Sequence, residues 1–449
     1  MTTVAPPRLD RSRLSAFYAR LVRGAAGWLT PRRVKTYPAV LILGAAVFLL
    51  WGEWVALRSG LPFAQTLGQD FAAFYAGGRF FLDGRLAQLY DFSAQRTFLA
   101  DQVAPGMKAL FVNPPFTVLL FALFAWDGYE AGLFLWWGLG LLALAFSIYL
   151  LRGEMLSTAS PSVARLLWAS FLFYPTLAWF IYAQNAPLTL LIYVLIFVML
   201  RRGRDFAAGL ALGLLLFKPQ LAVALGVMLL VKRRWRALAG GALSAGVWAG
   251  VGYALSPAAT RAFLRLAPAL PELERARSHT WGLNSFFGFA ALLLDGVWRA
   301  GADLLAAGLT LAGLLVVAAW WRRTAWQPGA RAWDFTLAAT LTLGLLISPH
   351  LFLYDLMLLL LPLAIVWSYY AQGTNDRALD GGPLLAWTAA LYAATFIGSY
   401  FSAAQQQLSL ALGLPPIALQ LSVPVIAGWG WVVARLGRRV TPEPGPIHG

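Results

Sequence analysis

Residues 38–57 read PAVLILGAAVFLLWGEWVAL, an apolar run whose single charged residue is Glu53. A run of this length and character matches what a helix needs to cross the hydrocarbon core of a bilayer. It is too long for a removable signal peptide and lacks a small-residue cleavage site. We therefore expect a membrane-spanning helix here.

The residues before this run carry eight lysines and arginines against one acid, Asp10. Basic residues next to a span stay in the cytoplasm, and the basic C-terminal tail follows the same rule. We therefore expect an even number of spans. The chain divides into a cytoplasmic tail (1–36), one transmembrane domain (37–435) and a second cytoplasmic tail (436–449).

The composition supports a membrane protein, with 60% hydrophobic residues, 12% charged residues and 20 tryptophans. The absence of cysteine excludes disulfides, thiolate metal sites and a cysteine nucleophile. The net charge of +16 comes from cations in short connections and tails, so we attribute it to membrane orientation and not to nucleic-acid binding.

Further apolar runs predict an all-α polytopic protein with about 12 transmembrane helices. Two long connections, about 58–112 and 255–283, are expected to face away from the cytoplasm, the first with amphipathic helices. Residues 284–294 are too short to cross and are predicted to be re-entrant or interfacial. The other expected spans are 131–150, 163–182, 186–200, 206–231, 236–254, 301–321, 333–348, 352–370, 383–401 and 416–435, with a shorter run that ends at residue 126.

The run 206–231 lies between two basic clusters, 201–204 and 232–236, that both favour the cytoplasm. Either this run is a hairpin of two half-helices broken at Lys218-Pro219, or one cluster breaks the rule. A proline and a charge in mid-span are typical of a broken helix that lines a cavity.

The first connection contains Gly68-Gln69-Asp70-Phe71-Ala72-Ala73-Phe74-Tyr75-Ala76-Gly77-Gly78-Arg79. Its aromatic residues recur at helical spacing, and Asp83-Gly84 then stops the pattern. Asp70 therefore stands at the start of a short amphipathic helix. It is either an N-cap or a catalytic base, and the two roles can coexist. A second helix is expected over residues 93–102, capped by Asp91 or Ser93.

Other polar groups are expected to converge with Asp70. They are the stretch 278–285, the group Ser348-Pro349-His350 with Tyr354-Asp355, and Lys218. Ionisable residues inside a span need partners, so we expect an anion near Lys218 and a helix dipole or an arginine near Asp355. His350 is equally consistent with ligand binding and with a structural role. No phosphate loop, paired metal-ligating histidines or serine nucleophile elbow is present in the sequence.

These motifs resemble glycosyltransferase family 87 over residues 65–370. The resemblance is carried by Gln69-Asp70-Phe71, Tyr90-Asp91, Asn113-Pro114-Pro115-Phe116, Ala183-Gln184-Asn185, Lys218-Pro219-Gln220 and Ser348-Pro349-His350. It implies a bacterial inner-membrane enzyme of the GT-C fold that uses a polyprenyl-phosphate sugar, typically mannose, and a glycan or glycolipid acceptor.

The resemblance also implies that Asp70 is the general base and that the Lys218 and His350 regions contact the lipid phosphate. We add Arg79, Gln184, Asn284 and Tyr75 as candidate substrate-binding residues. An attacking hydroxyl needs a base, and a leaving phosphate needs cations. Such a single displacement inverts the anomeric centre and requires neither a metal nor a nucleotide cofactor. The second connection departs from the family pattern, which leaves the acceptor undefined.

Two other functions fit a polytopic chain. A transporter or lipid flippase would show inverted repeats or paired broken helices, and the sequence offers one candidate break, at Lys218-Pro219. A polymerase or ligase of lipid-linked glycans would be expected to carry its large external loop late in the chain.

Overall fold

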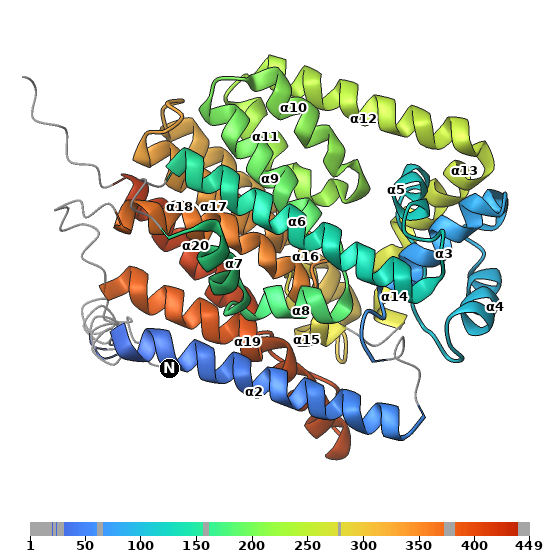
Figure 1. The fold of residues 1–449 in the computed structure, drawn as a ribbon. Coiled ribbons are helices and arrows are strands. Elements are labelled where there is room, and N and C mark those ends of the chain that lie inside the picture. Colours follow the sequence, from blue (N-terminus) through green and yellow to red (C-terminus); the bar gives the residue numbers. More distant parts are fainter. Residues whose placement is uncertain are drawn as a thin grey trace, which may run out of the picture.

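The computed structural model describes residues 31–60, 66–155, 161–276, 280–371 and 382–438, together with Arg20 and Gly24. Every regular element within these ranges is helical (Figure 1). Most of the two predicted tails and the first two residues of the stretch 278–285, Ser278 and His279, lie outside the described residues. The α-helices are α2 (Pro31–Arg58), α3 (Phe71–Leu82), α4 (Phe92–Gln102), α5 (Val118–Ala122), α6 (Tyr129–Met155), α7 (Val163–Phe171), α8 (Tyr174–Tyr182), α9 (Ala186–Arg201), α10 (Asp205–Leu214), α11 (Val223–Val231), α12 (Trp235–Leu255), α13 (Pro257–Leu266), α14 (Leu270–Ala276), α15 (Phe286–Leu294), α16 (Arg299–Arg323), α17 (Arg331–Ile347), α18 (Leu360–Ala371), α19 (Gly382–Ala411) and α20 (Ser422–Arg438).

Ion pairs gather several helix termini at one end of the bundle, which we call the basic end. Arg201, at the end of α9, pairs with Glu154 of α6 and with Asp334 of α17. Arg234, just before α12, pairs with Asp205 at the start of α10. The basic clusters 201–204 and 232–236 therefore lie at the same end.

The opposite end, which we call the loop end, collects the two long connections. The amide of Gly68 donates to the carbonyl of Ile181 at 2.8 Å, and the Tyr129 hydroxyl donates to the Gly68 carbonyl at 2.9 Å. Helices α3, α4, α5, α13 and α14 cluster here, far from the start of α2 (Figure 1). The predicted grouping of the two connections is confirmed, whereas their side of the membrane stays a prediction.

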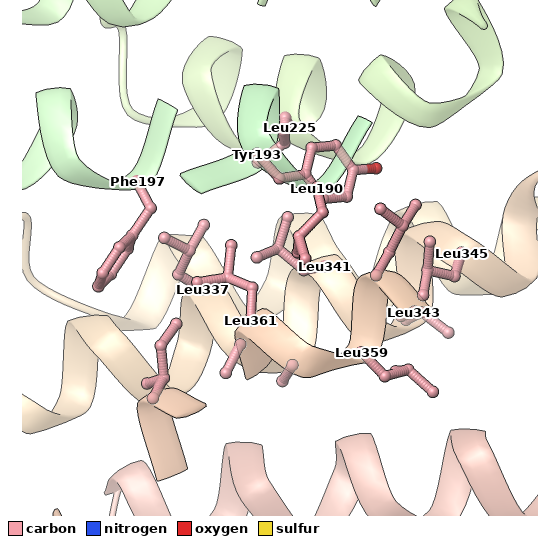
Figure 2. Packing of buried hydrophobic residues seen from close by; sticks show 14 of the residues in the cluster. Leu190, Tyr193, Phe197, Leu225, Leu337, Leu341, Leu343, Leu345, Leu359 and Leu361 are labelled. Atoms are coloured by element: carbon pink, nitrogen blue, oxygen red, sulfur yellow. The ribbon is translucent and has the colours of Figure 1, made fainter. Parts of the chain in front are cut away.

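Helix α17 lies at the centre of the main hydrophobic core. Residues 333–347 are buried on all sides, as expected for an apolar helix surrounded by others. Its leucines pack against Leu190, Tyr193 and Phe197 of α9 and Leu225 of α11 (Figure 2). A second, smaller core joins α3, α4 and α5 to the start of α6. The loop end thus has its own core.

Six of the described helices are long and apolar enough to cross a membrane, or up to seven if a bent pair counts as one span. That pair is α7 and α8, which meet at 82°. The prediction of one ordinary span over 163–182 is therefore wrong. Pro175 in the first turn of α8 has no backbone N–H, which favours a new helix start there. The total of about 12 spans stays a prediction.

The structure confirms a broken hairpin over residues 206–231. Helix α10 continues as η4 (Leu215–Phe217), the chain breaks at Lys218, and η5 (Pro219–Ala222) leads into α11. Lys218 has an extended φ of −138° because the proline that follows disfavours the helical region. Glycines then let α12 approach α10 closely: a Cβ on Gly209 would lie 2.0 Å from the Ala237 carbonyl oxygen.

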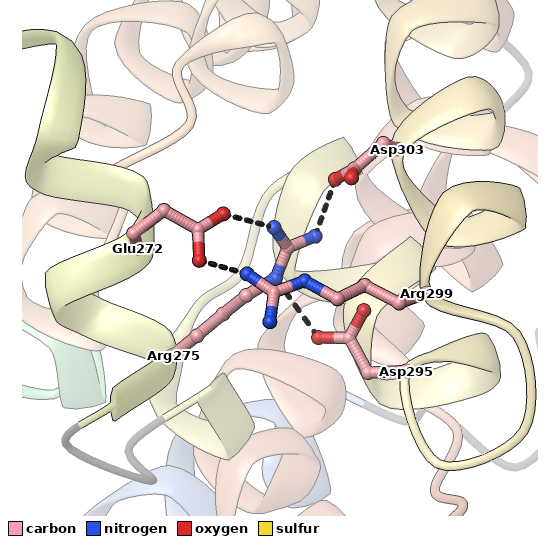
Figure 3. A network of polar contacts seen from close by, with 5 residues as sticks. All are labelled: Glu272, Arg275, Asp295, Arg299 and Asp303. Atoms are coloured by element: carbon pink, nitrogen blue, oxygen red, sulfur yellow. Dashed lines mark hydrogen bonds and ion pairs between the residues drawn. The ribbon is translucent and has the colours of Figure 1, made fainter.

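An ion-pair network fixes the second connection to the start of α16 (Figure 3). Arg275 of α14 bonds Glu272 at 2.9 Å and Asp295 at 3.0 Å, and it also pairs with Asp303. Arg299 pairs with Glu272, and this hydrogen bond is the main cause that lowers the pKa of that carboxyl. The network holds α14 at the loop end.

Candidate active site

Helix α3 forms as predicted and presents Asp70 at its start. It ends at Asp83, and Gly84 adopts a φ of 69°, a value that glycine takes without strain. The helix is nearly enclosed and not laid on a surface, since Phe74 stacks on Phe121 at 4.5 Å and Phe71 packs on Trp136. The expected amphipathic helix is therefore buried on nearly all sides.

Asp70 occupies the N-cap position of α3, but its carboxylate does not cap the helix. Its φ and ψ of −74° and −22° are already helical, whereas a capping residue needs an extended backbone to reach the first N–H groups. The capping prediction is wrong for Asp70. It is confirmed for Asp91, whose carboxylate accepts from the amides of Ser93 and Ala94 at 2.9 and 3.1 Å.

The half-buried Asp70 carboxylate accepts a hydrogen bond from Gln184. Gln184 Nε2 lies 2.9 Å from Asp70 Oδ2, which joins two segments 114 residues apart. An amide N–H donor at this distance orients the carboxylate. The structure thus brings together two of the predicted site residues.

The backbone around Gln184 is held in place from both sides. Ala183 ends α8 with a left-handed φ of 53°, which is uncommon for a residue with a side chain. The indole of Trp136 donates to the Ala183 carbonyl at 2.9 Å, and that of Trp179 donates to the Gln184 carbonyl at 2.7 Å. Because strained backbone of this kind persists only where its surroundings fix it, Gln184 is rigidly positioned.

Two tyrosines lie within electrostatic range of Asp70, and one of them is also within range of an acid–base pair. Tyr182 and Tyr354 face each other with ring centroids 5.8 Å apart, and both interact electrostatically with the Asp70 carboxylate. Tyr354 also interacts with the buried Glu274, whose Oε1 lies 3.7 Å from His350 Nδ1. Of the stretches expected to converge, 278–285 contacts Ser348-Pro349-His350, since the Ser285 hydroxyl donates to the Pro349 carbonyl at 3.3 Å. Their convergence on Asp70 stays a prediction.

Lys218 forms a buried ion pair. Its Nζ lies 2.7 Å from Asp355 Oδ1, and the two side chains are 10% and 0% exposed. Asp355 Oδ2 also accepts from the amide of Phe352 at 3.2 Å. Phe352 is the N-cap of the 3-10 helix η8 (Leu353–Leu359), so the expected helix terminus is one partner of Asp355, and the expected arginine is corrected to Lys218. This pair offsets the desolvation of both charges, so burial alone does not require an external anion.

The remaining predicted residues lie elsewhere. Arg79 pairs with Asp83 at 2.8 Å and not with Asp70, because α3 carries it away from its own N-terminus. Burial raises the pKa of the Tyr75 hydroxyl, and its ring packs on Tyr129. The amide side chain of Asn284 bonds Gly282, Ser399 and Ser422, which ties the second connection to α19 and α20.

Glu274 and Tyr182 were not predicted from the sequence, and Tyr354 was expected near the site without a role of its own. Glu274 gave no signal, because an acid in a charged connection is usually solvated and only the fold buries it. Within the described parts of the chain, no group of three or more histidines, acids or cysteines is placed to hold a metal ion.

The bundle of apolar helices and the polar site at its loop end define a polytopic membrane protein. A family model for glycosyltransferase family 87 matches residues 111–349, more than half of the 449 residues. The chain belongs to glycosyltransferase family 87, which indicates a membrane glycosyltransferase with a sugar donor and an acceptor. No curated protein and no solved structure matched the chain.

The family match covers only part of the site. Gln184, Lys218 and Asn284 lie inside it, and His350 follows its last residue. Asp70, Tyr75 and Arg79 precede it, so their place in the site rests on the geometry described above.

Proposed function

We propose that the protein transfers a sugar, mannose in the first instance, from a polyprenyl-phosphate donor to a glycan or glycolipid acceptor at the loop end. The observation that carries this proposal is the hydrogen bond from Gln184 to the half-buried Asp70 carboxylate. A carboxylate that is oriented, partly sheltered and not engaged as a helix cap is suited to accept a proton.

The proposed reaction is a single displacement. The acceptor hydroxyl attacks the anomeric carbon and gives its proton to Asp70, while the bond from that carbon to the phosphate oxygen breaks. The phosphate leaves with the electron pair, and a β-linked donor gives an α-linked product. Neither a nucleotide nor a metal cofactor takes part in this scheme.

Cations near the leaving phosphate would stabilise its developing charge, and Lys218 and His350 are the candidates. Lys218 would share its charge between Asp355 and the phosphate, since one ammonium carries three N–H donors. Tyr75, Arg79 and Asn284 have structural contacts, and we propose no more for them than a supporting role around the substrates. The GT-C fold is an expectation from the same family.

We further propose that the loop end faces away from the cytoplasm of a bacterial inner membrane, with both termini inside. This orientation follows from the positive charge that collects at the basic end. A lipid-linked donor would then reach the site from the bilayer.

The test is transfer by the purified protein from a panel of labelled polyprenyl-phosphate sugars, followed by analysis of the product. Asp70→Asn keeps the shape and an oxygen that accepts from Gln184, so the variant is expected to fold and bind donor. Its transfer rate is expected to fall by roughly 10²-fold or more if a general base is lost. Asp83→Asn is the matched control, because it removes another carboxylate at the opposite end of α3. Turnover within a factor of a few of the parent in Asp70→Asn would reduce Asp70 to a structural residue.

A transporter or flippase remains the second candidate. The bend between α7 and α8 adds a second broken segment to the one at Lys218. Both breaks lie in the first half of the chain, whereas paired breaks of a transporter lie at corresponding positions of its two halves. Transport of a labelled lipid-linked sugar without product formation would favour this function.

A further inference from the structure

A hollow of about 780 Å³ lies at the basic end, remote from the candidate active site. Its walls are the turn from α9 to α10, residues 203–207, and the turn from α11 to α12, residues 233–236. These walls contribute four arginines and a single carboxylate. The hollow is therefore strongly positive.

Most of this charge is uncompensated. The one carboxylate, Asp205, pairs with Arg234, whose guanidinium also lies 4.9 Å from the centre of the Trp326 ring. Among the residues that the structure describes, no carboxylate pairs with Arg204, Arg233 or Arg236. Three guanidinium groups thus surround a cavity without an acidic partner.

Two helix N-termini add to the positive potential. Helices α10 and α12 both begin in the wall of the hollow, and neither start has a side-chain cap. The first N–H groups of a helix and its dipole favour an anion at that position. The backbone and the arginines therefore select the same kind of ligand.

Arg233 lies at a turn position that favours glycine. Both turns end the preceding helix with the same pair of hydrogen bonds, from Gly203 and Arg204 in the first and from Arg233 and Arg234 in the second. Glycine takes the left-handed position in the first turn, with a φ of 67°, but in the second turn Arg233 takes it with a φ of 51°. Arg233 therefore occupies a position that glycine would fill at a lower conformational cost.

The rim of the hollow carries two exposed aromatic residues, Phe206 and Trp235, which are 45% and 62% exposed. Tryptophan is typical of the interface between a membrane and water. Basic pockets between transmembrane helices bind lipid head groups. We propose that this hollow binds the phosphate of an anionic phospholipid, with Arg204, Arg233 and Arg236 as its ligands.

The full-length protein in neutral detergent should bind dioctanoyl phosphatidylglycerol saturably, as measured by native mass spectrometry. Arg233→Gly removes one guanidinium and also relieves the left-handed backbone, so it should weaken binding at least tenfold without lowering the unfolding temperature. Arg322→Ala is the matched control, since it removes one charge from the last turn of α16, outside the hollow, and should leave binding unchanged.

Four outcomes would overturn the proposal. Equal binding of dioctanoyl phosphatidylcholine would show that the charge of the headgroup is not recognised. Displacement by an equal concentration of inorganic phosphate would make free phosphate the ligand and exclude a lipid. An equal loss of lipid binding in Arg322→Ala would mean that the lipid is attracted by the positive surface in general. Unchanged lipid binding in Arg233→Gly would show that the hollow is not the binding site.

Discussion

The ion pair between Lys218 and Asp355 gives the sharpest prediction of stability. Lys218→Met leaves the Asp355 carboxylate without its cation at a position that is 0% exposed. Breaking a buried pair from one side costs roughly 3–5 kcal/mol, because the remaining charge stays desolvated. We expect the single variant to unfold at a much lower concentration of sodium dodecyl sulfate, as followed by circular dichroism.

A double-mutant cycle tests the pair directly. Its second variant is Asp355→Asn, which removes the charge and keeps an oxygen that accepts from the Phe352 amide. Combined with Lys218→Met it leaves no buried charge at the pair, so the double variant should recover much of the stability. The expected coupling is roughly 2–3 kcal/mol. Additive losses would refute the view that Asp355 is the reason why Lys218 tolerates burial.

The same double variant separates stability from donor binding. If Lys218 also contacts the donor phosphate, the folded double variant should bind the donor about tenfold or more weakly, the value of one lost charge-assisted contact. Unchanged donor affinity would limit Lys218 to its role in the fold.

Two further predictions concern the site and its orientation. Gln184→Leu removes one hydrogen bond to a charged group, so it should lower kcat for sugar transfer about tenfold or more and leave the KM for the donor unchanged. Steady-state kinetics would measure both constants, and a raised KM with an unchanged kcat would contradict a positioning role. Single cysteines at the exposed positions Ala87 and Ala258 should react with an impermeant thiol reagent in spheroplasts, whereas one at Ala325 should react only after permeabilisation. The parent chain has no cysteine of its own, so the reverse pattern would invert the proposed topology.

The sequence allowed the helical elements to be predicted well where periodicity or a breaker residue acts locally. The pattern over residues 71–82 predicts α3 and its end at Asp83, and Lys218-Pro219 predicts the break between α10 and α11. The basic clusters on either side of 206–231 also favour the hairpin that the structure contains. In each case the residues that carry the pattern lie close in the sequence to the helix end or break that they predict.

Partners across the fold were not predictable in the same way. Arg79 is the first basic residue after Asp70 in the chain, but α3 directs it to Asp83. The contact that forms instead, from Gln184, joins residues far apart in the chain. A single sequence contains no record of such pairing, because it depends on how α3 packs against α6 and on where α8 ends.

The division of the interior into two hydrophobic cores has a consequence for the reaction geometry. Asp70 begins the helix at the centre of the smaller core, whereas Lys218 and Asp355 belong to segments of the larger one. The spacing between the proposed base and the proposed cation is therefore set by how the two cores meet. A small rotation of one core relative to the other would change this spacing while the packing inside each core is kept. Substitutions at the contact between the two cores are therefore expected to alter turnover without unfolding either core.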